Sequence, residues 1–276
     1  VNPDGSNNND GRSEKNPLAT IEYAVEKAKI AKSNATKNEF KTVILLSEGI
    51  HQVNQTIRID ENGPWPIAFQ AYEGTNPVIS AGKRISGWKK GKVNNKSCWV
   101  ANLPEVKNGD WYFRQLFVNG NRAQRPRFPE EGFYEVKDPL FGDSDNMGEK
   151  LDGAARDRFI FHEGDIDPDW KNLQDINAMV IHYWQEDYLP VKSVNPEKNE
   201  VVFSAKSYMA FVRSHPAHVC ENAWYYMDNV FEALDNPGEW YLDRVKGELY
   251  YIPRSDETMK TAEIYAPVAG QIFRFE

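Results

Sequence analysis

The chain has 276 residues, of which 33 are Lys or Arg and 41 are Asp or Glu, so its formal net charge is −8. This acidic balance argues against a nucleic-acid-binding protein, because such proteins present a basic surface to phosphates. With 40% hydrophobic residues the chain can bury a core. It contains no apolar run of the ~18 residues that a membrane span needs. Its two cysteines, Cys98 and Cys220, allow at most one disulfide.

The first sixteen residues are dominated by Asn, Asp, Gly and Ser, a composition that predicts a loop. Ser6, Asn8 and Asp10 have the offsets of the first calcium ligands of an EF-hand, but Pro17 stands where a bidentate Glu is required. We therefore interpret the segment as a series of turns. Because the chain opens at Val1 and not at Met, we expect that a signal peptide has been removed and that the protein is extracellular or periplasmic.

Residues 20–32 carry apolar side chains at helical spacing, which predicts an amphipathic helix. Thr20 is the expected N-cap, with Asn16 before Pro17 as the alternative. The apolar stripe consists of Ile21, Ala24, Val25, Ala28 and Ala31. We expect this helix to cover the end of a repeating β-structure, which would otherwise expose apolar side chains and unpaired strand edges.

Short strand-like runs separated by turn residues follow the helix, with no second helical pattern between them. The runs are residues 41–46, 50–53, 56–59, 67–71 and 77–80. This pattern disfavours a doubly wound α/β sheet and favours a coiled solenoid of short strands. Residues 267–275 return to the same pattern, so we expect the solenoid to resume there.

Between these regions the runs are longer, more aromatic and joined by hairpin turns. Asn119-Gly120 predicts a type I′ hairpin, because both central residues must adopt positive φ. Residues 240–243 and 248–253 predict a second hairpin. The expected domains are 1–84, with the cap and the first solenoid turns, 85–258, an inserted antiparallel β-domain, and 259–276, a return to the solenoid whose continuation is missing.

Several motifs resemble a known family. The DGS and PLATI runs at 4–6 and 17–21 resemble the N-terminal cap of right-handed parallel β-helix, pectate-lyase-like proteins. Four later motifs are similar to β-helix glycoside hydrolases of family 141 type. They are RQLFVNG at 114–120, RPRFP at 125–129, PGEWYLD at 237–243 and GELYY at 247–251.

The resemblance implies an all-β fold: a right-handed parallel β-helix with a capping helix, interrupted by an antiparallel β-sandwich-like insert. It also implies an exported, fucosidase- or xylan-active-like glycoside hydrolase that acts on polysaccharide without a cofactor. This piece would supply the solenoid cap and a wall of the sugar groove. The catalytic carboxylates are expected beyond residue 276, so residues 1–276 alone should be inactive. The alternatives are a polysaccharide lyase and a non-catalytic carbohydrate-binding β-helix protein.

Trp184 and Glu186 are candidate contacts to a saccharide. They lie in the run 181–188, which combines aromatic rings with carboxylates, as sugar sites do. If this run is one alternating strand, Trp184 and Glu186 share a face with His182, and Ile181 and Tyr183 belong to the core.

Asn229 and Glu232 are two further candidates, in the aromatic and polar segment 222–235. We expect this segment to clamp the insert onto the solenoid, which would place its polar side chains beside the groove.

Two clusters of possible ligands favour structural interpretations. The acidic residues Glu163, Asp165, Asp167 and Asp169 alternate with Gly and Pro, which is typical of a solvated loop. The segment 214–220 offers three metal donors, His215, His218 and Cys220, but a structural zinc site needs four. A His-activated Cys220 nucleophile has no local signal of a lowered thiol pKa. We therefore expect no metal site.

Overall fold

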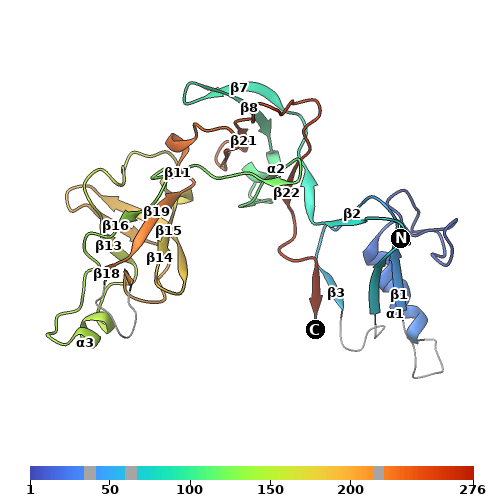
Figure 1. Cartoon of the computed structure of the whole chain (residues 1–276), viewed down its shortest axis with the longest axis horizontal. Helices are drawn as coiled ribbons and strands as arrows, with labels where there is room; N and C mark the ends of the chain where they lie inside the picture. The colour runs from blue at the N-terminus through green and yellow to red at the C-terminus, as the bar shows by residue number, and fades with distance from the viewer. Residues whose placement is uncertain (34–41, 60–66, 214–220) are drawn as a thin grey trace. The chain divides into compact units, whose positions relative to one another are not determined.

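A computed structural model describes residues 1–33, 42–59, 67–213 and 221–276 (Figure 1). Strands predominate in this part of the chain. Its helices are α1 (Ile21–Ser33), α2 (Pro104–Lys107) and α3 (Met147–Asp152), with 3-10 turns η1 (Leu173–Asp175) and η2 (Phe231–Ala233). The chain divides into two compact units, of which unit 1 comprises Val1–Ser86, Trp111–Asn121 and Glu263–Glu276, and unit 2 comprises Gly87–Asp110 and Arg122–Ala262.

Unit 1 combines short parallel pairs with a small antiparallel sheet. Its strands are β1 (Thr42–Leu46), β2 (Ile50–Gln52), β3 (Ile57–Ile59), β4 (Ile67–Ala71), β5 (Val78–Ser80), β6 (Gly82–Arg84), β9 (Phe117–Val118), β22 (Ile264–Pro267) and β23 (Phe273–Phe275), with β10 (Asn121–Arg122) at its boundary. Three separate parallel pairs form, β1 with β4, β2 with β5 and β3 with β23. The antiparallel sheet has the order β10-β9-β22-β6.

The prediction of a right-handed parallel β-helix is therefore wrong. Among the described residues each parallel pair is a sheet of two strands, the strands form many small sheets, and no solenoid closes. Antiparallel, sandwich-like sheets predominate. The physical reason is that a run of three to five alternating residues identifies a strand but not its partner, since pairing depends on residues distant in the sequence.

Helix α1 confirms the amphipathic helix expected over 20–32. Thr20 is its N-cap, because the Thr20 Oγ1 accepts the N–H of Tyr23 at 3.2 Å and one otherwise unpaired amide of the first turn is satisfied. The apolar stripe is buried at Ile21, Ala24, Val25 and Ala28. It packs largely with side chains of β1 and β3 in one core cluster. The helix thus covers a core of short sheets and not the end of a solenoid.

Unit 2 contains two larger antiparallel sheets. The seven-stranded sheet has the order β11-β19-β14-β15-β16-β13, with β12 also on β19, and the four-stranded sheet has the order β20-β21-β8-β7. The strands are β7 (Lys89–Val93), β8 (Lys96–Asn102), β11 (Arg127–Phe128), β12 (Tyr134–Glu135), β13 (Arg158–Ile160), β14 (Asn177–Ile181), β15 (Glu186–Asn195), β16 (Glu200–Phe203), β17 (Val212–Arg213), β18 (Glu221–Asn222), β19 (Trp224–Asp228), β20 (Trp240–Asp243) and β21 (Glu248–Tyr251).

Both expected hairpin turns are confirmed. Asn119 and Gly120 have φ of 50° and 79° between β9 and β10, as a type I′ turn requires. Strands β20 and β21 pair antiparallel over their whole length. A further two-residue turn, Asn94-Asn95, joins β7 to β8 with φ of 46° and 65°. This turn was not among the predicted hairpins, although Asn tolerates positive φ better than most residues other than Gly.

A large hydrophobic core of unit 2 lies on one side of the seven-stranded sheet. Tyr225 is fully buried there, with its ring 4.9 Å from that of Phe159, and Phe159 contacts Phe211 at 5.1 Å. Aromatic pairs at these distances add to the stability that burial provides. Because side chains alternate along a strand, this core fixes which residues of β14, β15 and β19 point to the other side.

The run 181–188 is not one continuous strand. Strand β14 ends at Ile181, the backbone N–H of His182 donates to the carbonyl of Gln185 at 2.9 Å, and β15 begins at Glu186. The residues between them form a turn, so Tyr183 is 52% exposed and the prediction that it is a core residue is wrong. The same prediction for Ile181 is also wrong, because Ile181 is half-buried and points to the side opposite the buried Val180. The aromatic composition of this run is typical of a strand. In the structure, however, a tight turn follows Ile181, and β14 and β15 pair antiparallel from the Ile181–Glu186 pair to the Asn177–Pro190 pair.

Candidate functional site

The side of β14, β15 and β19 that faces away from the core gathers aromatic and charged residues. We call it the outer face. On β19, Tyr225 and Met227 are buried in the core, so Tyr226 and Asp228 belong to the outer face. The outer face consists of Met179, Ile181, Glu186, Tyr188, Trp224, Tyr226 and Asp228.

Cross-strand pairing brings these residues into rows. Met179 is opposite Tyr188 on one side and Tyr226 on the other. Ile181 is likewise flanked by Glu186 and Trp224. Directly opposite side chains lie within contact distance of each other, so the outer face is a continuous aromatic and polar surface.

Arg125 lies at one end of this surface and links two of its polar groups, Asp228 and Tyr188, to the neighbouring Asn229. Its Nη1 lies 2.8 Å from the Oδ2 of Asp228 and donates to the hydroxyl of Tyr188 at 2.9 Å. Its Nε donates to the Oδ1 of Asn229 at 3.3 Å. The Arg125 and Asp228 side chains are only 11% and 13% exposed. Charge-assisted hydrogen bonds in such surroundings hold the side chains in one arrangement.

Arg127 occupies the adjacent position, directly opposite Asp228 in the pairing of β11 with β19. Its guanidinium carbon lies 3.8 Å from the centroid of the Tyr226 ring and 5.6 Å from that of Phe133. Phe133 in turn stacks on Trp224 at 5.7 Å with an interplanar angle of 9°. Cations over aromatic faces are attracted by the ring quadrupole, so these contacts order the surface.

Two ionisable groups here have pKa values shifted by their surroundings. Burial raises the pKa of the Tyr226 hydroxyl, and the nearby Asp228 carboxylate raises it further. Burial lowers the pKa of the Arg127 guanidinium. The tyrosine therefore stays a neutral hydroxyl that can donate or accept hydrogen bonds at neutral pH.

The outer face does not assemble a glycosidase acid/base pair from its carboxylates. Asn177 is paired with Asp228, and Ile181, four residues later on β14, is paired with Glu186. With ~3.3 Å per residue and ~4.8 Å between strands, the Cα atoms of Glu186 and Asp228 are roughly 16 Å apart. Glycosidases hold their two carboxyl groups about 5 to 9.5 Å apart. The arrangement suits binding and not acid/base catalysis by these two groups.

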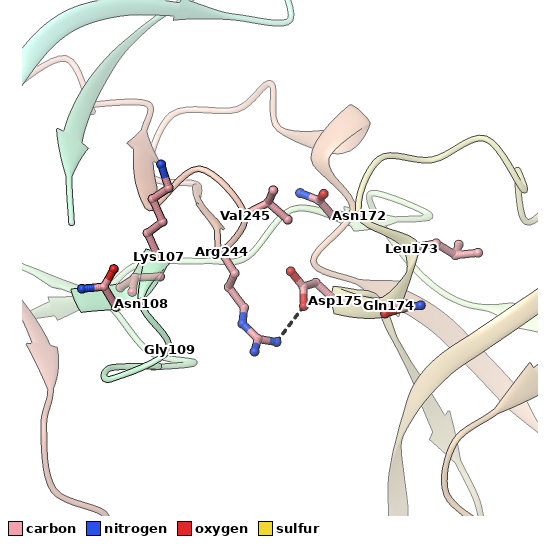
Figure 2. A pocket seen from close by; sticks show the side chains of 10 residues that line it. Lys107, Asn108, Gly109, Asn172, Leu173, Gln174, Asp175, Arg244 and Val245 are labelled. Carbon is pink, nitrogen blue, oxygen red and sulfur yellow. Dashed lines mark hydrogen bonds and ion pairs between the residues drawn. The ribbon is translucent and has the colours of Figure 1, made fainter. Parts of the chain in front are cut away.

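A second candidate is an open cleft of about 640 Å³ within unit 2. Arg244 and Asp175 face each other there and form an ion pair of 2.9 Å, while the side chain of Lys107 points away from this pair (Figure 2). Its lining residues in the described chain include no aromatic ring. Because the central charges neutralise each other and there is no ring surface for a sugar, the outer face is the stronger candidate.

The four residues predicted as saccharide contacts are not brought together. Glu186 is exposed on the outer face, whereas Trp224, not Trp184, is the tryptophan of that face. Trp184 is 79% exposed in the turn after β14, and its ring lies 4.7 Å from that of Tyr183.

Asn229 and Glu232 lie near the other end of β14, because β19 runs antiparallel to it. Asn229 is buried, and its Nδ2 donates to the carbonyl of Asp175 at 3.0 Å while its Oδ1 accepts from Arg125. Glu232 is exposed on η2 and accepts the backbone N–H of Lys171 at 3.1 Å. Asn229 thus positions Arg125, and Glu232 is remote from Glu186.

The residues predicted as saccharide contacts do not include Arg125, Arg127, Tyr188, Tyr226 or Asp228. The sequence does contain a signal for these residues. The RPRFP motif at 125–129 contains both arginines, and the strand-like segment 224–228 places alternate side chains on one face. What the sequence lacks is the pairing of β11, β14 and β15 with β19, which alone places these side chains on one surface.

The histidines and cysteine considered as metal ligands, at 215, 218 and 220, lie outside the described residues. Cys98 is buried, and Cys220, with which it could form a disulfide, is not among the described residues. Within 1–33, 42–59, 67–213 and 221–276, no group of three His, Cys, Asp or Glu side chains is arranged to hold a metal ion. The helices of that part of the chain are also too short or too polar to cross a membrane.

Residues 96–254 match the model of the GH141 insertion domain. This range holds the outer face and every strand of the two larger sheets of unit 2 except β7. The chain therefore belongs to the GH141 insertion domain family. No curated protein matches the chain.

The fold is shared with a solved structure described as a glycoside hydrolase. That structure is 21% identical in sequence and superposes with a TM-score of 0.75. The match covers 100% of this chain and 47% of the other chain. The chain thus spans about half the length of that protein. A second structure, titled the complex structure of XylC with xylose, is 15% identical with a TM-score of 0.36, and 99% of this chain covers 32% of it. That score is too low for the likeness to carry an argument.

Proposed function

We propose that this chain is part of a glycoside hydrolase acting on polysaccharide and that the outer face of unit 2 contacts the saccharide. The observation that carries the proposal is the gathering of Tyr188, Tyr226, Asp228 and two arginines on one sheet face inside the matched domain. Saccharides combine apolar ring faces with many hydroxyl groups. A surface of rings interspersed with ordered donors and acceptors complements both features.

The similarity in fold to a solved glycoside hydrolase supports the proposal at the level of the protein class. A fold alone does not determine a reaction. The family's name and the character of the outer face both favour a carbohydrate ligand. More specifically, we propose that the bond cleaved is a fucoside or a xylan linkage. We also propose that the protein is exported, because polysaccharides do not cross membranes.

In this proposal unit 2 supplies binding, and the acid/base carboxylates belong to a part of the enzyme outside residues 1–276. The separation of Glu186 and Asp228 supports this division, since they are too far apart to share one glycosidic bond. We expect purified residues 1–276 to release no reducing sugar from fucosides, xylosides or galactosides. Turnover that Glu186→Gln abolishes would contradict this expectation.

Binding itself is tested by calorimetric titration of a panel of xylo-, galacto- and fucosylated oligosaccharides against the 276-residue chain. We expect at least one to bind, and Tyr226→Ala to weaken it about fivefold or more, because an aromatic contact contributes on the order of 1 kcal/mol. Tyr23→Ala is the matched control, since Tyr23 is an exposed tyrosine on α1 in unit 1. Equal losses in the two variants, or no binding by any member of the panel, would contradict the proposal.

A further inference from the structure

Arg127 differs from the other arginines around the outer face in its hydrogen-bond partners. Its Nε donates to the carbonyl of Pro129 at 2.9 Å, and its Nη2 donates to the carbonyl of Gly132. Both acceptors are neutral. Among the residues that the structure describes, no carboxylate lies within ion-pair distance of Arg127, whereas Arg125 pairs with Asp228 and Arg213 with Glu221.

The positive charge of Arg127 is therefore not neutralised by a direct ion pair with any described residue. The carboxylate that acts on Arg127, Asp228, lies 2.8 Å from Arg125. It interacts with Arg127 only at longer range. Within the described part of the chain, Arg127 thus has no carboxylate within ion-pair distance, and Asp228 compensates its positive charge only in part.

The charge of Arg127 is also partly desolvated. The Arg127 side chain is half-buried, and its guanidinium carbon lies 3.8 Å from the centroid of the Tyr226 ring. Removing a cation from water is unfavourable unless a negative partner replaces the hydration, and an arginine does not escape the cost by deprotonating. A negatively charged group of a bound ligand would compensate this cost at Arg127.

The geometry leaves Arg127 able to bind that group. A guanidinium has five N–H donors, and the bonds to Pro129 and Gly132 use one at Nε and one at Nη2. Donors at Nη1 and Nη2 remain, on the part of the fork that matches a carboxylate or sulfate oxygen pair. The segment is held by these backbone bonds and by pairing of β11 with β19, so the fork is oriented before a ligand arrives.

We infer that the outer face binds an anionic saccharide, one whose sugar carries a carboxylate or a sulfate ester, and that Arg127 pairs with this group. The inference rests on the proposed function and narrows its substrate class. Arg125 keeps Asp228 engaged, so that the carboxylate does not compete for Arg127. The Tyr226 and Tyr188 hydroxyls lie beside it on the same face as partners for sugar hydroxyls.

The test compares charged and neutral forms of the same sugars on the 276-residue chain. An oligogalacturonate is titrated beside its methyl ester, and a sulfated galactose oligosaccharide beside its desulfated form, which separates a carboxylate from a sulfate. We expect one charged form to bind about tenfold or more tightly than its neutral counterpart, as a hydrogen-bonded charge pair provides. Arg127→Gln should reduce this ratio to about one.

Matched variants separate the role of Arg127 from a general effect of charge or folding. Arg158→Gln removes the same charge from β13, where Arg158 pairs with its neighbour Asp157, and should leave the ratio unchanged. Arg127→Lys keeps the charge and should retain part of the preference, so it decides the matter if Arg127→Gln does not fold.

Each outcome is decisive. Equal binding of charged and neutral forms by the unmodified chain would overturn the anionic class and leave the proposed function standing. A preference that survives in Arg127→Gln would overturn the assignment to Arg127. If none of the four sugars, nor any member of the neutral panel, binds, then the proposed function fails and this inference fails with it.

Discussion

The Nη1 of Arg125 lies 2.8 Å from the Oδ2 of Asp228, and neither side chain is more than 13% exposed. The two residues are 103 positions apart in the sequence, and the pair joins the segment before β11 to the end of β19. Buried charges are stable only when they are paired and hydrogen-bonded. The pair is therefore a structural support of the outer face as well as part of its polar surface.

Removing Arg125 should strongly destabilise unit 2. We expect Arg125→Met to lower the free energy of unfolding by about 3 kcal/mol, because it leaves the largely buried Asp228 carboxylate without its partner. Urea denaturation measures the change. The double variant with Asp228→Leu should lose less than the sum of the two single changes, since the residues are coupled.

The control for this prediction is Arg158→Met, which breaks the solvent-exposed contact with Asp157 and should have little or no effect on unfolding. A loss as large as that of Arg125→Met would show that the cost does not come from burying an unpaired charge.

Glu186 and Asp187 are sequence neighbours with different roles, because they point to opposite sides of β15. The Asp187 Oδ2 accepts the Ser207 hydroxyl at 2.5 Å and the Tyr208 N–H at 3.1 Å, and it lies 3.2 Å from the Nε2 of His182. We expect Asp187→Asn to cost about 1 to 3 kcal/mol of unfolding free energy, since these bonds lose the carboxylate charge that strengthens them. Thermal denaturation measures the loss.

Glu186→Gln is the matched variant on the outer face, where the side chain is exposed. It should leave the unfolding midpoint nearly unchanged and alter only saccharide binding. A destabilisation by Glu186→Gln that equals that of Asp187→Asn would contradict the assignment of the two residues to different faces.

Asp165 has a raised pKa because it is partly buried, and the Tyr225 hydroxyl opposes the shift by donating to its Oδ2 at 2.8 Å. Tyr225→Phe removes a donor that stabilises the ionised carboxylate, so the pKa of Asp165 should rise further. The same change should cost about 1 to 2 kcal/mol of stability at neutral pH. Carboxyl NMR titration measures the pKa, and Tyr208→Phe, at an exposed hydroxyl, is the control. An unchanged or lower Asp165 pKa would contradict the prediction.

Glu239 couples stability to pH. It is buried in the turn before β20, where its Oε2 accepts the backbone N–H groups of Asp235 and Asn236 at 3.1 and 3.0 Å. Burial raises its pKa above the ordinary 4.5, so the folded state favours the protonated form. This contribution to stability is therefore fully present below about pH 4.5 and is lost as the pH rises through the folded-state pKa.

Glu239→Gln keeps an acceptor oxygen for the turn but does not titrate. The difference in unfolding free energy between this variant and the unmodified chain should therefore shift in favour of the variant as the pH rises from 4 to 7. Urea denaturation across this range measures it, with Glu131→Gln as a charge-matched substitution in an exposed turn. Parallel profiles for the unmodified chain and Glu239→Gln would rule out the coupling.

Local features of the structure could be predicted from the sequence. The helix α1 and its Thr20 cap follow from apolar spacing and a hydroxyl in the right place, and the Asn119-Gly120 turn follows from the φ angles that its residues tolerate. These features depend on interactions between residues only a few positions apart. The strand content and the antiparallel character of the 240–251 hairpin could be predicted for the same reason.

Only the tertiary structure decided how the strands pair. The runs at 42–46 and 67–71 form one parallel pair and not a turn of a β-helix. Ile181 ends a strand, whereas the aromatic pattern of 181–188 is compatible with one continuous strand. The outer face likewise depends on bringing Arg125 and Arg127 to Tyr226 and Asp228, about a hundred residues later. Alternation of side chains defines which residues share a face within a strand, but the partner strand and its register come from burial summed over the whole core.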